Sequence, residues 1–227
     1  MLRTFLAPLT AAAMLLSSHA AFAQARSPAF PIVADDGRPI LNHRVKPDQA
    51  TAVEKLPGAV ILGNPKGDVT LAEFYDVNCP YCRRASNDVD SLLRQDRNLR
   101  LVLVPFPVLG LQSVLAGRVE LAVRRLATPA QFYEFHRRLF AGRGTIDGER
   151  ALEAAQALKF EREKLIEIAN DDATTEIMKT HVRLGNALDL AATPSYVIGD
   201  VAILGHPGAE SLKRVVASMR QCGKAVC

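Results

Sequence analysis

The stretch Cys79-Pro80-Tyr81-Cys82 constrains this chain most, because closely spaced cysteines indicate redox, metal or disulfide sites. An apolar run over residues 69–75 precedes it and an amphipathic segment over residues 85–93 follows it, which predicts a junction between a strand and a helix. At a helix N-terminus, unpaired backbone N–H groups and the helix dipole favour a thiolate. We therefore predict that Cys79 is the nucleophile and that Cys82, one helical turn later, is the resolving thiol.

The residues between the two cysteines agree with this position. Pro80 suits the first position of a helix, because the N–H that proline lacks would have no partner there. Half of a zinc site and a short structural disulfide are the alternatives. Thiol–disulfide exchange is favoured because a Cys-x-x-Cys motif beside a strand–helix–strand pattern is typical of redox proteins.

Residues 1–23 have the pattern of a cleaved signal peptide. Arg3 supplies the positive start, residues 5–16 are apolar, and Ala21-Phe22-Ala23 is a small-residue cleavage site. A membrane anchor is the alternative, but the segment is shorter than the roughly 20 residues that a spanning helix needs. We expect a soluble, exported mature protein that begins at Gln24.

Length and charge limit the function classes. The 227 residues suffice for one domain with an inserted subdomain, or for two small domains. The formal net charge of +4 becomes +3 without Arg3, and this small surplus is spread along the chain. No basic run is dense enough to indicate a nucleic-acid-binding surface.

The four cysteines form two local pairs rather than a dispersed framework. Disulfides persist in oxidising compartments, but a disulfide-stapled scaffold would distribute its cysteines, so we expect a stabilising hydrophobic core. Cys222 and Cys227 close a short loop at the C-terminus, and a structural disulfide is the favoured prediction. An accessory redox pair and metal binding remain alternatives for these two residues.

Residues 24–57 are predicted to be an irregular arm or linker. They contain five prolines and the turn signal Asp35-Asp36-Gly37, with one short helix expected over residues 48–55. Three possibilities stay open for the arm: it is disordered, it packs on the domain, or it mediates oligomerisation.

The compact domain is predicted to begin near Gly58. Strands are expected over residues 59–62, 69–75 and 99–106, with a helix from the cysteine motif to about Asp96. The second strand, this helix and the third strand form one βαβ unit, so the two strands should be parallel with a right-handed crossover.

The second half of the chain is predicted to be helical before it returns to strands. Apolar spacing indicates helices over residues 112–126, 129–140, 149–158, 161–169 and 172–188, and Thr128-Pro129 is a helix start signal. Strands over residues 195–199 and 201–204 form a hairpin around Gly199-Asp200, and a last helix covers residues 208–219.

These features together resemble the DsbA-like family of thioredoxin-fold thiol:disulfide oxidoreductases from bacterial envelopes. Residues 69–76 leading into the cysteine motif carry the resemblance, with Ala192-Thr193-Pro194-Ser195-Tyr196 before the hairpin, over about residues 58–220. It implies an α/β protein with a thioredoxin-like fold, in which a helical domain (about residues 110–192) is inserted between the βαβ half and the ββα half. The domain would cover residues 58–227, and the protein would be periplasmic.

The resemblance also implies roles for three residues outside the cysteine motif. The Thr193-Pro194 peptide bond is expected to be cis and to lie against the motif, where the backbone binds an extended substrate segment. An ordinary trans proline at a strand start is the alternative. Glu73 is expected to be buried beneath the cysteines and to relay a proton to or from Cys82, and a solvated carboxylate is the alternative.

Pro80 and Tyr81 are expected to tune the redox potential. DsbA carries Pro-His at these positions, and Tyr81 has no cationic form, so the pKa of Cys79 should be lowered less than in DsbA. Potentials in this fold run from about −270 mV for thioredoxin to about −120 mV for DsbA, and we predict an intermediate value. Thr193 resembles the isomerase branch of the family, whereas DsbA itself carries valine there.

The predicted function is formation or reshuffling of disulfides in exported proteins. A monomeric oxidase is favoured over an isomerase, because residues 24–57 lack the long helix that oligomeric relatives use. A membrane redox partner and exported substrates are expected, without a cofactor. An isomerase or reductase kept in the dithiol state is one alternative, and a Cu(I)-binding metal-tolerance protein that uses the same thiolates is another.

The histidines carry no predicted chemistry. None of them has metal-ligand spacing with either cysteine pair, so no metal site is predicted. The four histidines after the predicted signal peptide are His43, His136, His181 and His206. His206 follows the predicted hairpin in a Gly-rich turn near the active face, and we expect a structural role for it.

Overall fold

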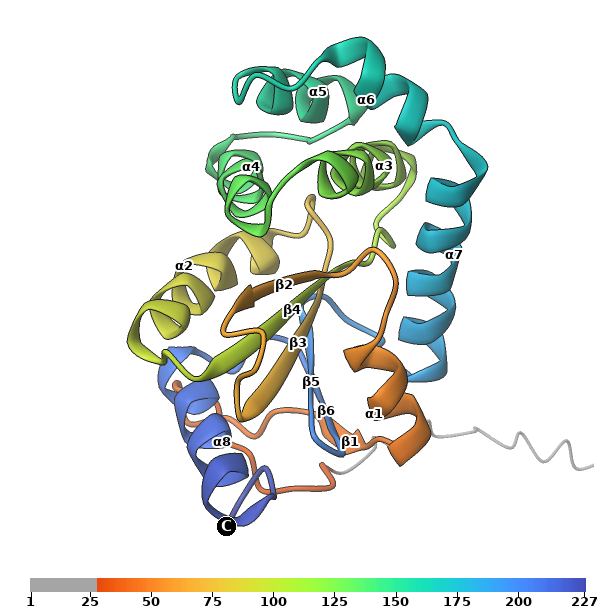
Figure 1. Ribbon diagram of the computed structural model, residues 1–227. Coiled ribbons are helices and arrows are strands. Elements are labelled where there is room, and N and C mark those ends of the chain that lie inside the picture. Colours follow the sequence, from red (N-terminus) through yellow and green to blue (C-terminus); the bar gives the residue numbers. More distant parts are fainter. Residues whose placement is uncertain (1–27) are drawn as a thin grey trace, which may run out of the picture.

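The computed structural model describes residues 28–227, so the predicted signal peptide lies outside the described part of the chain. A mixed sheet with strand order β1-β6-β5-β3-β4-β2 forms its centre (Figure 1). The strands are β1 (Asn42–Arg44), β2 (Val60–Gly63), β3 (Val69–Tyr75), β4 (Leu99–Pro105), β5 (Ser195–Ile198) and β6 (Val201–Leu204). The helices are α1 (Pro47–Glu54), α2 (Pro80–Gln95), α3 (Leu111–Leu126), α4 (Pro129–Ala141), α5 (Gly148–Gln156), α6 (Arg162–Ala169), α7 (Asp172–Ala187) and α8 (Ala209–Cys222).

The predicted βαβ unit is present as β3, α2 and β4. These two strands are parallel, with Val69 opposite Leu99 at one end and Tyr75 opposite Pro105 at the other. The other strand pairs in the sheet are antiparallel, including the predicted hairpin of β5 and β6. The thioredoxin-like fold with an inserted helical domain is therefore confirmed.

Successive side chains of β3 point to opposite faces of the sheet, because a strand has a period of two residues. Leu71 and Tyr75 belong to the core beneath α2 and α8, whereas Ala72 and Phe74 belong to the core beneath α1 and α7. Figure 1 shows α2 and α8 on one side of the sheet and α1 and α7 on the other. Glu73 shares its face with Leu71 and Tyr75, so the alternation places its carboxyl on the α2 side.

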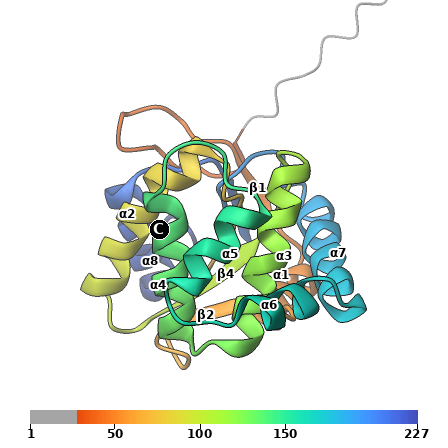
Figure 2. The ribbon, with the colours of Figure 1, turned by 90° about the horizontal axis from the view of Figure 1, so that it is seen from above.

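The inserted helices cover one end of the sheet. α3 and α4 lie next to the sheet, and α5 and α6 lie beyond them (Figures 1 and 2). The predicted start of α4 is confirmed: Thr128 and Gln131 form a capping box around Pro129.

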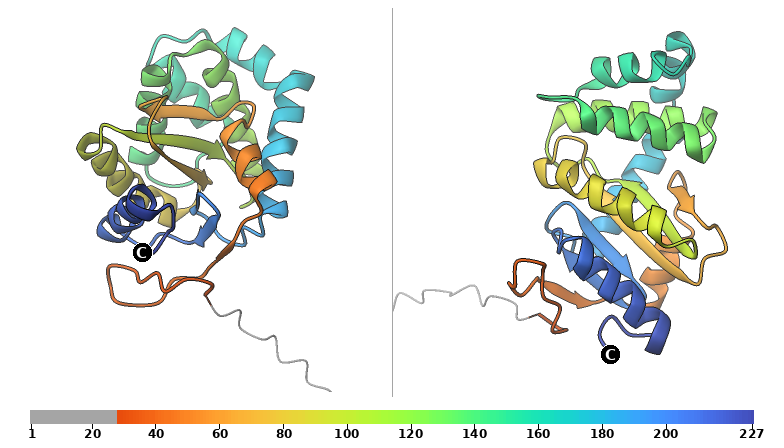
Figure 3. Two further views of the ribbon diagram at one scale, coloured as in Figure 1. Left: turned by 60° about the horizontal axis from the view of Figure 1, so that its bottom comes forward. Right: turned by 90° about the vertical axis from the view of Figure 1, so that its left-hand side faces the viewer.

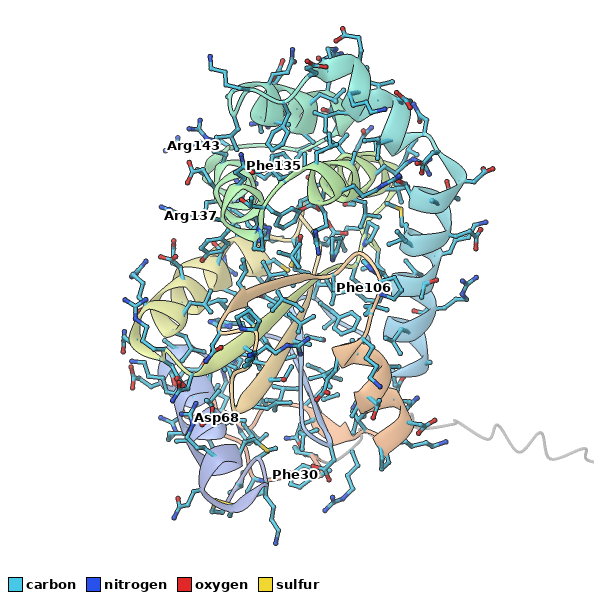
Figure 4. The ribbon with its side chains drawn as sticks, in the orientation of Figure 1. Phe30, Asp68, Phe106, Phe135, Arg137 and Arg143 are labelled. Atoms are coloured by element: carbon cyan, nitrogen blue, oxygen red, sulfur yellow. A yellow bond between two sulfur atoms is a disulfide. The ribbon has the colours of Figure 1, made fainter. Side chains whose placement is uncertain are left out.

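Helix α7 returns the chain to the sheet along its second face. Phe106, directly after β4, lies between the sheet and this helix (Figure 4). A Cβ at Gly185 would come within 2.4 Å of the Phe106 ring, so this glycine allows the close approach of α7.

The segment before residue 58 packs on the domain, which was one of the three possibilities left open by its sequence. Strand β1 pairs with β6 and so becomes an edge of the sheet, and α1 packs against β3 and β5. The side-chain amide of Asn42 is buried, and it donates to the carbonyls of Phe30 and Ile40 and accepts from the N–H of Phe30. Figure 3 shows this segment running beside α8 and the hairpin. The helix was predicted, but β1 was not.

Candidate active site

Cys79 stands where the sequence placed it, at the start of α2. It is the N-cap residue, with extended backbone angles, and Pro80 occupies the first helical turn. The Sγ atom of Cys79 accepts a hydrogen bond from the N–H of Cys82 at 3.4 Å. Both cysteines are free thiols and both are largely buried. The turn of helix between them brings the two sulfur-bearing side chains to the same end of α2.

The peptide bond between Thr193 and Pro194 is cis, as predicted, and it lies against the cysteine motif. The Cys79 thiol donates a hydrogen bond to the Thr193 carbonyl oxygen, with the two atoms 3.1 Å apart. Ser195 then begins β5, which pairs with β3 on the side opposite β4. The loop before β5 and the start of α2 therefore form two walls of one site.

The two thiols have opposite acidities. The hydrogen bond from the Cys82 thiol is the largest cause that lowers the pKa of Cys79, to about 6, with further hydrogen bonds from the Thr193 side chain and from the N–H groups of Cys82 and Tyr81. These contacts outweigh burial, which acts in the other direction. Burial raises the pKa of Cys82 far above that of a free thiol, and the negative charges of Cys79 and Glu73 add to this. Cys79 is thus the group that ionises near neutral pH.

Glu73 is buried, which favours the relay position over the solvated alternative. It is 4% exposed, and burial raises the pKa of its carboxyl to about 8. Tyr196 stands opposite Glu73 in the register of β3 and β5, and its hydroxyl lies 3.5 Å from Oε1 of Glu73. At neutral pH the carboxyl is therefore mostly protonated and holds a proton beneath the cysteines.

Tyr196 also contacts a histidine that the sequence did not connect to the site. Its hydroxyl oxygen lies 2.9 Å from Nδ1 of His206, and Nε2 of His206 lies 2.8 Å from Oδ2 of Asp88 on α2. From the sequence we predicted a structural role for His206 and no role for Tyr196 or Asp88. Asp88 lies 118 positions before His206 in the chain, so this contact follows from the fold alone.

A second group missed by the sequence fixes the loop before Cys79. The buried carboxylate of Asp76 accepts hydrogen bonds from four donors. The donors are the N–H groups of Asn78, Val108 and Leu109 and the hydroxyl of Ser113. The sequence signal that could have identified this group is the pair of polar residues Asp76 and Asn78 just before the cysteine motif.

Asn78 and Arg83 join this loop and α2 to the segment after α4. The amide of Asn78 exchanges hydrogen bonds with the backbone N–H and C=O of Ile146, and the Arg83 guanidinium donates to the carbonyls of Gly142 and Gly144. Arg143, between these two glycines, points outward with Arg137 of α4 (Figure 4). The inserted domain therefore holds the start of α2 in place.

Tyr81 is exposed at the mouth of the site. Its side chain is accessible, with 60% of the residue exposed, and the Arg84 guanidinium lies 4.5 Å from the centre of its ring. Tyr81, which lies between the two cysteines, therefore has a positively charged neighbour on one side of its ring.

Cys222 and Cys227 form a disulfide at the end of α8. Figure 1 shows this end of the chain at the opposite side of the molecule from the inserted helices. Among the described residues, no group of three or more His, Cys, Asp or Glu side chains is arranged to hold a metal ion. Within residues 28–227, no helix is both long and apolar enough to cross a membrane.

Comparisons with known proteins agree with the thioredoxin-like fold. A family model described as a DSBA-like thioredoxin domain matches residues 70–217. A thioredoxin-like oxidoreductase from Silicibacter pomeroyi is 33% identical, with a TM-score of 0.70 over 75% of this chain and 97% of that protein. A periplasmic thioredoxin-like protein from Salmonella enterica serovar Typhimurium is 25% identical, with a TM-score of 0.65 over 78% of this chain and 98% of that protein.

Two further similarities are more distant. The thiol-disulfide exchange protein alpha-DsbA2 from Wolbachia pipientis is 21% identical, with a TM-score of 0.69 over 76% of this chain and 92% of that protein. The Na(+)/H(+) antiporter NhaA 1 from Salinispora arenicola is 24% identical over 158 residues, which are 70% of this chain. This chain spans 24% of the antiporter's length, so the match covers about a quarter of that curated relative. The family match and the geometry around Cys79 agree, and the chain belongs to the DsbA-like thioredoxin family of thiol–disulfide oxidoreductases.

Proposed function

We propose that this protein is an exported oxidase that forms disulfides in envelope proteins, with Cys79 as the nucleophilic sulfur and Cys82 as the resolving one. The contrast between the two thiols carries the proposal: the pKa of Cys79 is lowered to about 6, whereas that of Cys82 is raised. Because Cys79 is a good leaving group as a thiolate, a second substrate thiolate readily displaces it from the mixed disulfide, and this step produces the reduced enzyme.

The reaction has two exchange steps. A substrate thiolate attacks Sγ of Cys79 in the Cys79–Cys82 disulfide, so that a mixed disulfide forms and Cys82 leaves with the electron pair. A second substrate thiolate then attacks the substrate sulfur of the mixed disulfide, and Cys79 leaves as a thiolate. The substrate gains a disulfide, and the enzyme becomes a dithiol that a membrane redox partner reoxidises.

The acidity of Cys79 supports an intermediate redox potential. A pKa of about 6 lies between the roughly 3.5 of DsbA and the roughly 7 of thioredoxin. A lower pKa stabilises the reduced enzyme and makes its disulfide more oxidising, so the potential should lie between about −270 and about −120 mV.

The backbone around Thr193 supports a substrate-binding role for Thr193 and Pro194. The Thr193 carbonyl is 3.1 Å from Sγ of Cys79, so an extended substrate segment paired with this backbone would bring its own sulfur to Cys79. The exposed Tyr81 ring would border the same segment.

A monomer fits the course of residues 28–57. They fold back as β1 and α1 onto the domain, instead of extending away from it as a separate oligomerisation element (Figure 3). Export rests on the pattern of residues 1–23.

Equilibration of the purified protein with glutathione, followed by acid quenching and alkylation, tests the oxidase proposal. We expect an intermediate potential, loss of all exchange in Cys79→Ser, and trapped mixed disulfides in Cys82→Ala. A potential as reducing as that of thioredoxin would reject the oxidase role. Exchange that persists in Cys79→Ser would reject the mechanism. In cells, a mostly oxidised Cys79–Cys82 pair is expected, whereas a mostly reduced pair would indicate an isomerase or reductase.

A further inference from the structure

A line of four polar side chains connects the protein interior beneath the cysteines with the surface. The Tyr196 hydroxyl lies 3.5 Å from Oε1 of Glu73 and 2.9 Å from Nδ1 of His206. Nε2 of His206 lies 2.8 Å from Oδ2 of Asp88. Glu73 and Tyr196 are buried, at 4% and 0% exposed, whereas the side chains of His206 and Asp88 are 13% and 41% exposed.

The fold brings these residues together from three elements and from the segment after β6. The pairing of β3 with β5 places Glu73 opposite Tyr196, on the sheet face covered by α2 and α8. His206 follows β6, and Asp88 lies on α2, the helix that begins at the cysteine motif. The line therefore runs beneath α2, from the floor of the active site to the flank of the helix.

We propose that Tyr196, His206 and Asp88 form a proton path between Glu73 and solvent. The inference rests on the proposed exchange mechanism and on Glu73 as the proton relay of Cys82. It assigns a function to three residues that the mechanism does not otherwise use.

The directions of the hydrogen bonds along the path depend on where the proton lies. The Tyr196 O–H donates to Oε1 of a Glu73 carboxylate. When Glu73 is protonated, rotation of the two hydroxyls reverses this bond, so that the Glu73 O–H donates to Tyr196, the Tyr196 O–H donates to Nδ1 of His206, and Nε2–H of His206 donates to the Asp88 carboxylate. A shift of one proton in each of the first two bonds leaves Glu73 as a carboxylate and His206 as an imidazolium. The Asp88 carboxylate then stabilises the imidazolium, which releases its proton to water at the surface.

This path supplies the proton that thiol–disulfide exchange consumes. When a substrate thiolate attacks Cys79, Cys82 leaves as a buried thiolate and takes the proton of Glu73. Solvent protonates His206 to the imidazolium, whose Nδ1 proton then passes to Tyr196 as the Tyr196 proton passes to the Glu73 carboxylate. In reoxidation the same steps run backwards, and the proton of the Cys82 thiol leaves by the same line.

Five other ionisable groups interact with Glu73. They are the thiols of Cys79 and Cys82 and the phenols of Tyr75, Tyr133 and Tyr196. Burial raises the pKa of each phenol, to about 12 for Tyr133, and it also raises that of Cys82. Burial therefore keeps these phenols neutral, and Tyr196 passes a proton on only as it receives another one.

The test follows reduction of the oxidised protein by glutathione, in water and in D₂O, by rapid acid quenching, alkylation and mass spectrometry. Tyr196→Phe removes one hydroxyl and keeps the ring, and His206→Gln keeps hydrogen bonding but carries no proton. Each variant should react at least about tenfold more slowly and show a larger solvent isotope effect, because proton supply becomes limiting. Adding either change to Glu73→Gln should slow that variant no further.

Matched controls separate proton transfer from loss of packing. His43→Gln removes another half-buried histidine, whose Nε2 contacts the Leu188 carbonyl, and Tyr133→Phe removes a hydroxyl that donates to Asp90. Both should react like the unmodified protein. Free imidazole should restore the rate of His206→Ala, because a small base can replace a missing proton carrier. This rescue tests the path even where Tyr196→Phe fails to fold.

The possible failures are distinguishable. Tyr196→Phe and His206→Gln variants that react at the unmodified rate, while Glu73→Gln is slow, overturn the path and leave the Glu73 relay intact. Slow variants without a larger isotope effect and without imidazole rescue show a structural role, and they also overturn the path. Full activity of Glu73→Gln removes the relay together with the path, whereas exchange in Cys79→Ser removes the proposed function itself.

Discussion

The Sγ atom of Cys79 and the carbonyl oxygen of Thr193 lie 3.1 Å apart, although 114 residues separate them in the chain. The thiol donates this hydrogen bond, so the contact favours the protonated sulfur. The N–H of Cys82 donates to the same sulfur from the other side and favours the thiolate. A sulfur held between a carbonyl and a helix N-terminus can change its hydrogen-bond partners as it gains or loses its proton.

The first prediction concerns the acidity of Cys79. Cys82→Ala removes the thiol that lowers the pKa of Cys79 most, so this pKa should rise from about 6 towards the value near 8.5 of a free thiol. Ultraviolet absorbance of the thiolate against pH measures it. Cys222→Ser/Cys227→Ser, which keeps the active pair, serves as the control. An unchanged Cys79 titration in Cys82→Ala would contradict this account.

The same acidity should make the stability of the reduced protein depend on pH. The pKa of Cys79 is lower in the folded than in the unfolded chain, so the thiolate stabilises the fold above the unfolded value. This stabilisation is lost as the pH falls through about 6. The free energy of unfolding of the reduced protein, minus that of the oxidised protein, should therefore increase from about pH 5 to about pH 9.

The second prediction concerns Glu73, whose pKa is displaced in the opposite sense. Burial raises the pKa of this carboxyl to about 8, so the neutral acid stabilises the fold at low pH and this stabilisation is lost as the pH rises through about 8. Glu73→Gln should abolish this loss. In the oxidised form, the variant should gain stability over the unmodified protein between about pH 5 and about pH 9, on the order of a few kcal/mol.

Urea denaturation across this pH range measures the effect of Glu73. Glu167→Gln, at an exposed carboxylate of α6, is the control and should follow the unmodified protein. Parallel stability curves for Glu73→Gln and the unmodified protein would show that the carboxyl is not buried as an acid.

The third prediction concerns Asp76, which is 1% exposed. Asp76→Ala leaves four donors without their acceptor, so it should lower the free energy of unfolding by about 3 kcal/mol or more. Ser113→Ala removes one of these donors and should cost about 1 kcal/mol. Urea or thermal denaturation measures both, with the exposed Asp48→Ala expected to stay within about 0.5 kcal/mol. If Asp76→Ala lowers the free energy of unfolding by no more than about 0.5 kcal/mol, the result would contradict the hydrogen-bond network around Asp76.

Local signals account for the parts of the fold that the sequence predicted. Residues 69–75 and the helix after Cys79 were predictable because strand alternation and N-cap chemistry involve neighbouring residues. Strand β1 was missed because Asn42–Arg44 is short and polar, and it is a strand only through its pairing with β6. A three-residue edge strand has no periodicity of its own to detect.

The residues of the site differ in the same way, because some belong to local motifs and others are brought together only by the fold. Cys79, Cys82 and the cis bond before Pro194 belong to short motifs, so sequence identified them before any contact was known. The contact of Tyr196 with Glu73 depends on the register of β3 with β5, and the contact of His206 with Asp88 depends on how α2 crosses the sheet. No local pattern encodes a contact between elements, so these residues became visible only in the fold.

The last prediction distinguishes the roles left open for Cys222 and Cys227. Their disulfide closes a loop across a sequence separation of 5 at the end of α8, and Ala225 within it is buried. A closed loop of this length restricts the unfolded chain by about 2 kcal/mol, so Cys222→Ser/Cys227→Ser should be less stable by up to about that amount. Glutathione exchange at Cys79 and Cys82 should keep its rate, because a structural disulfide passes on no electrons. A double variant that unfolds like the unmodified protein but turns over more slowly would instead identify the pair as an accessory redox centre.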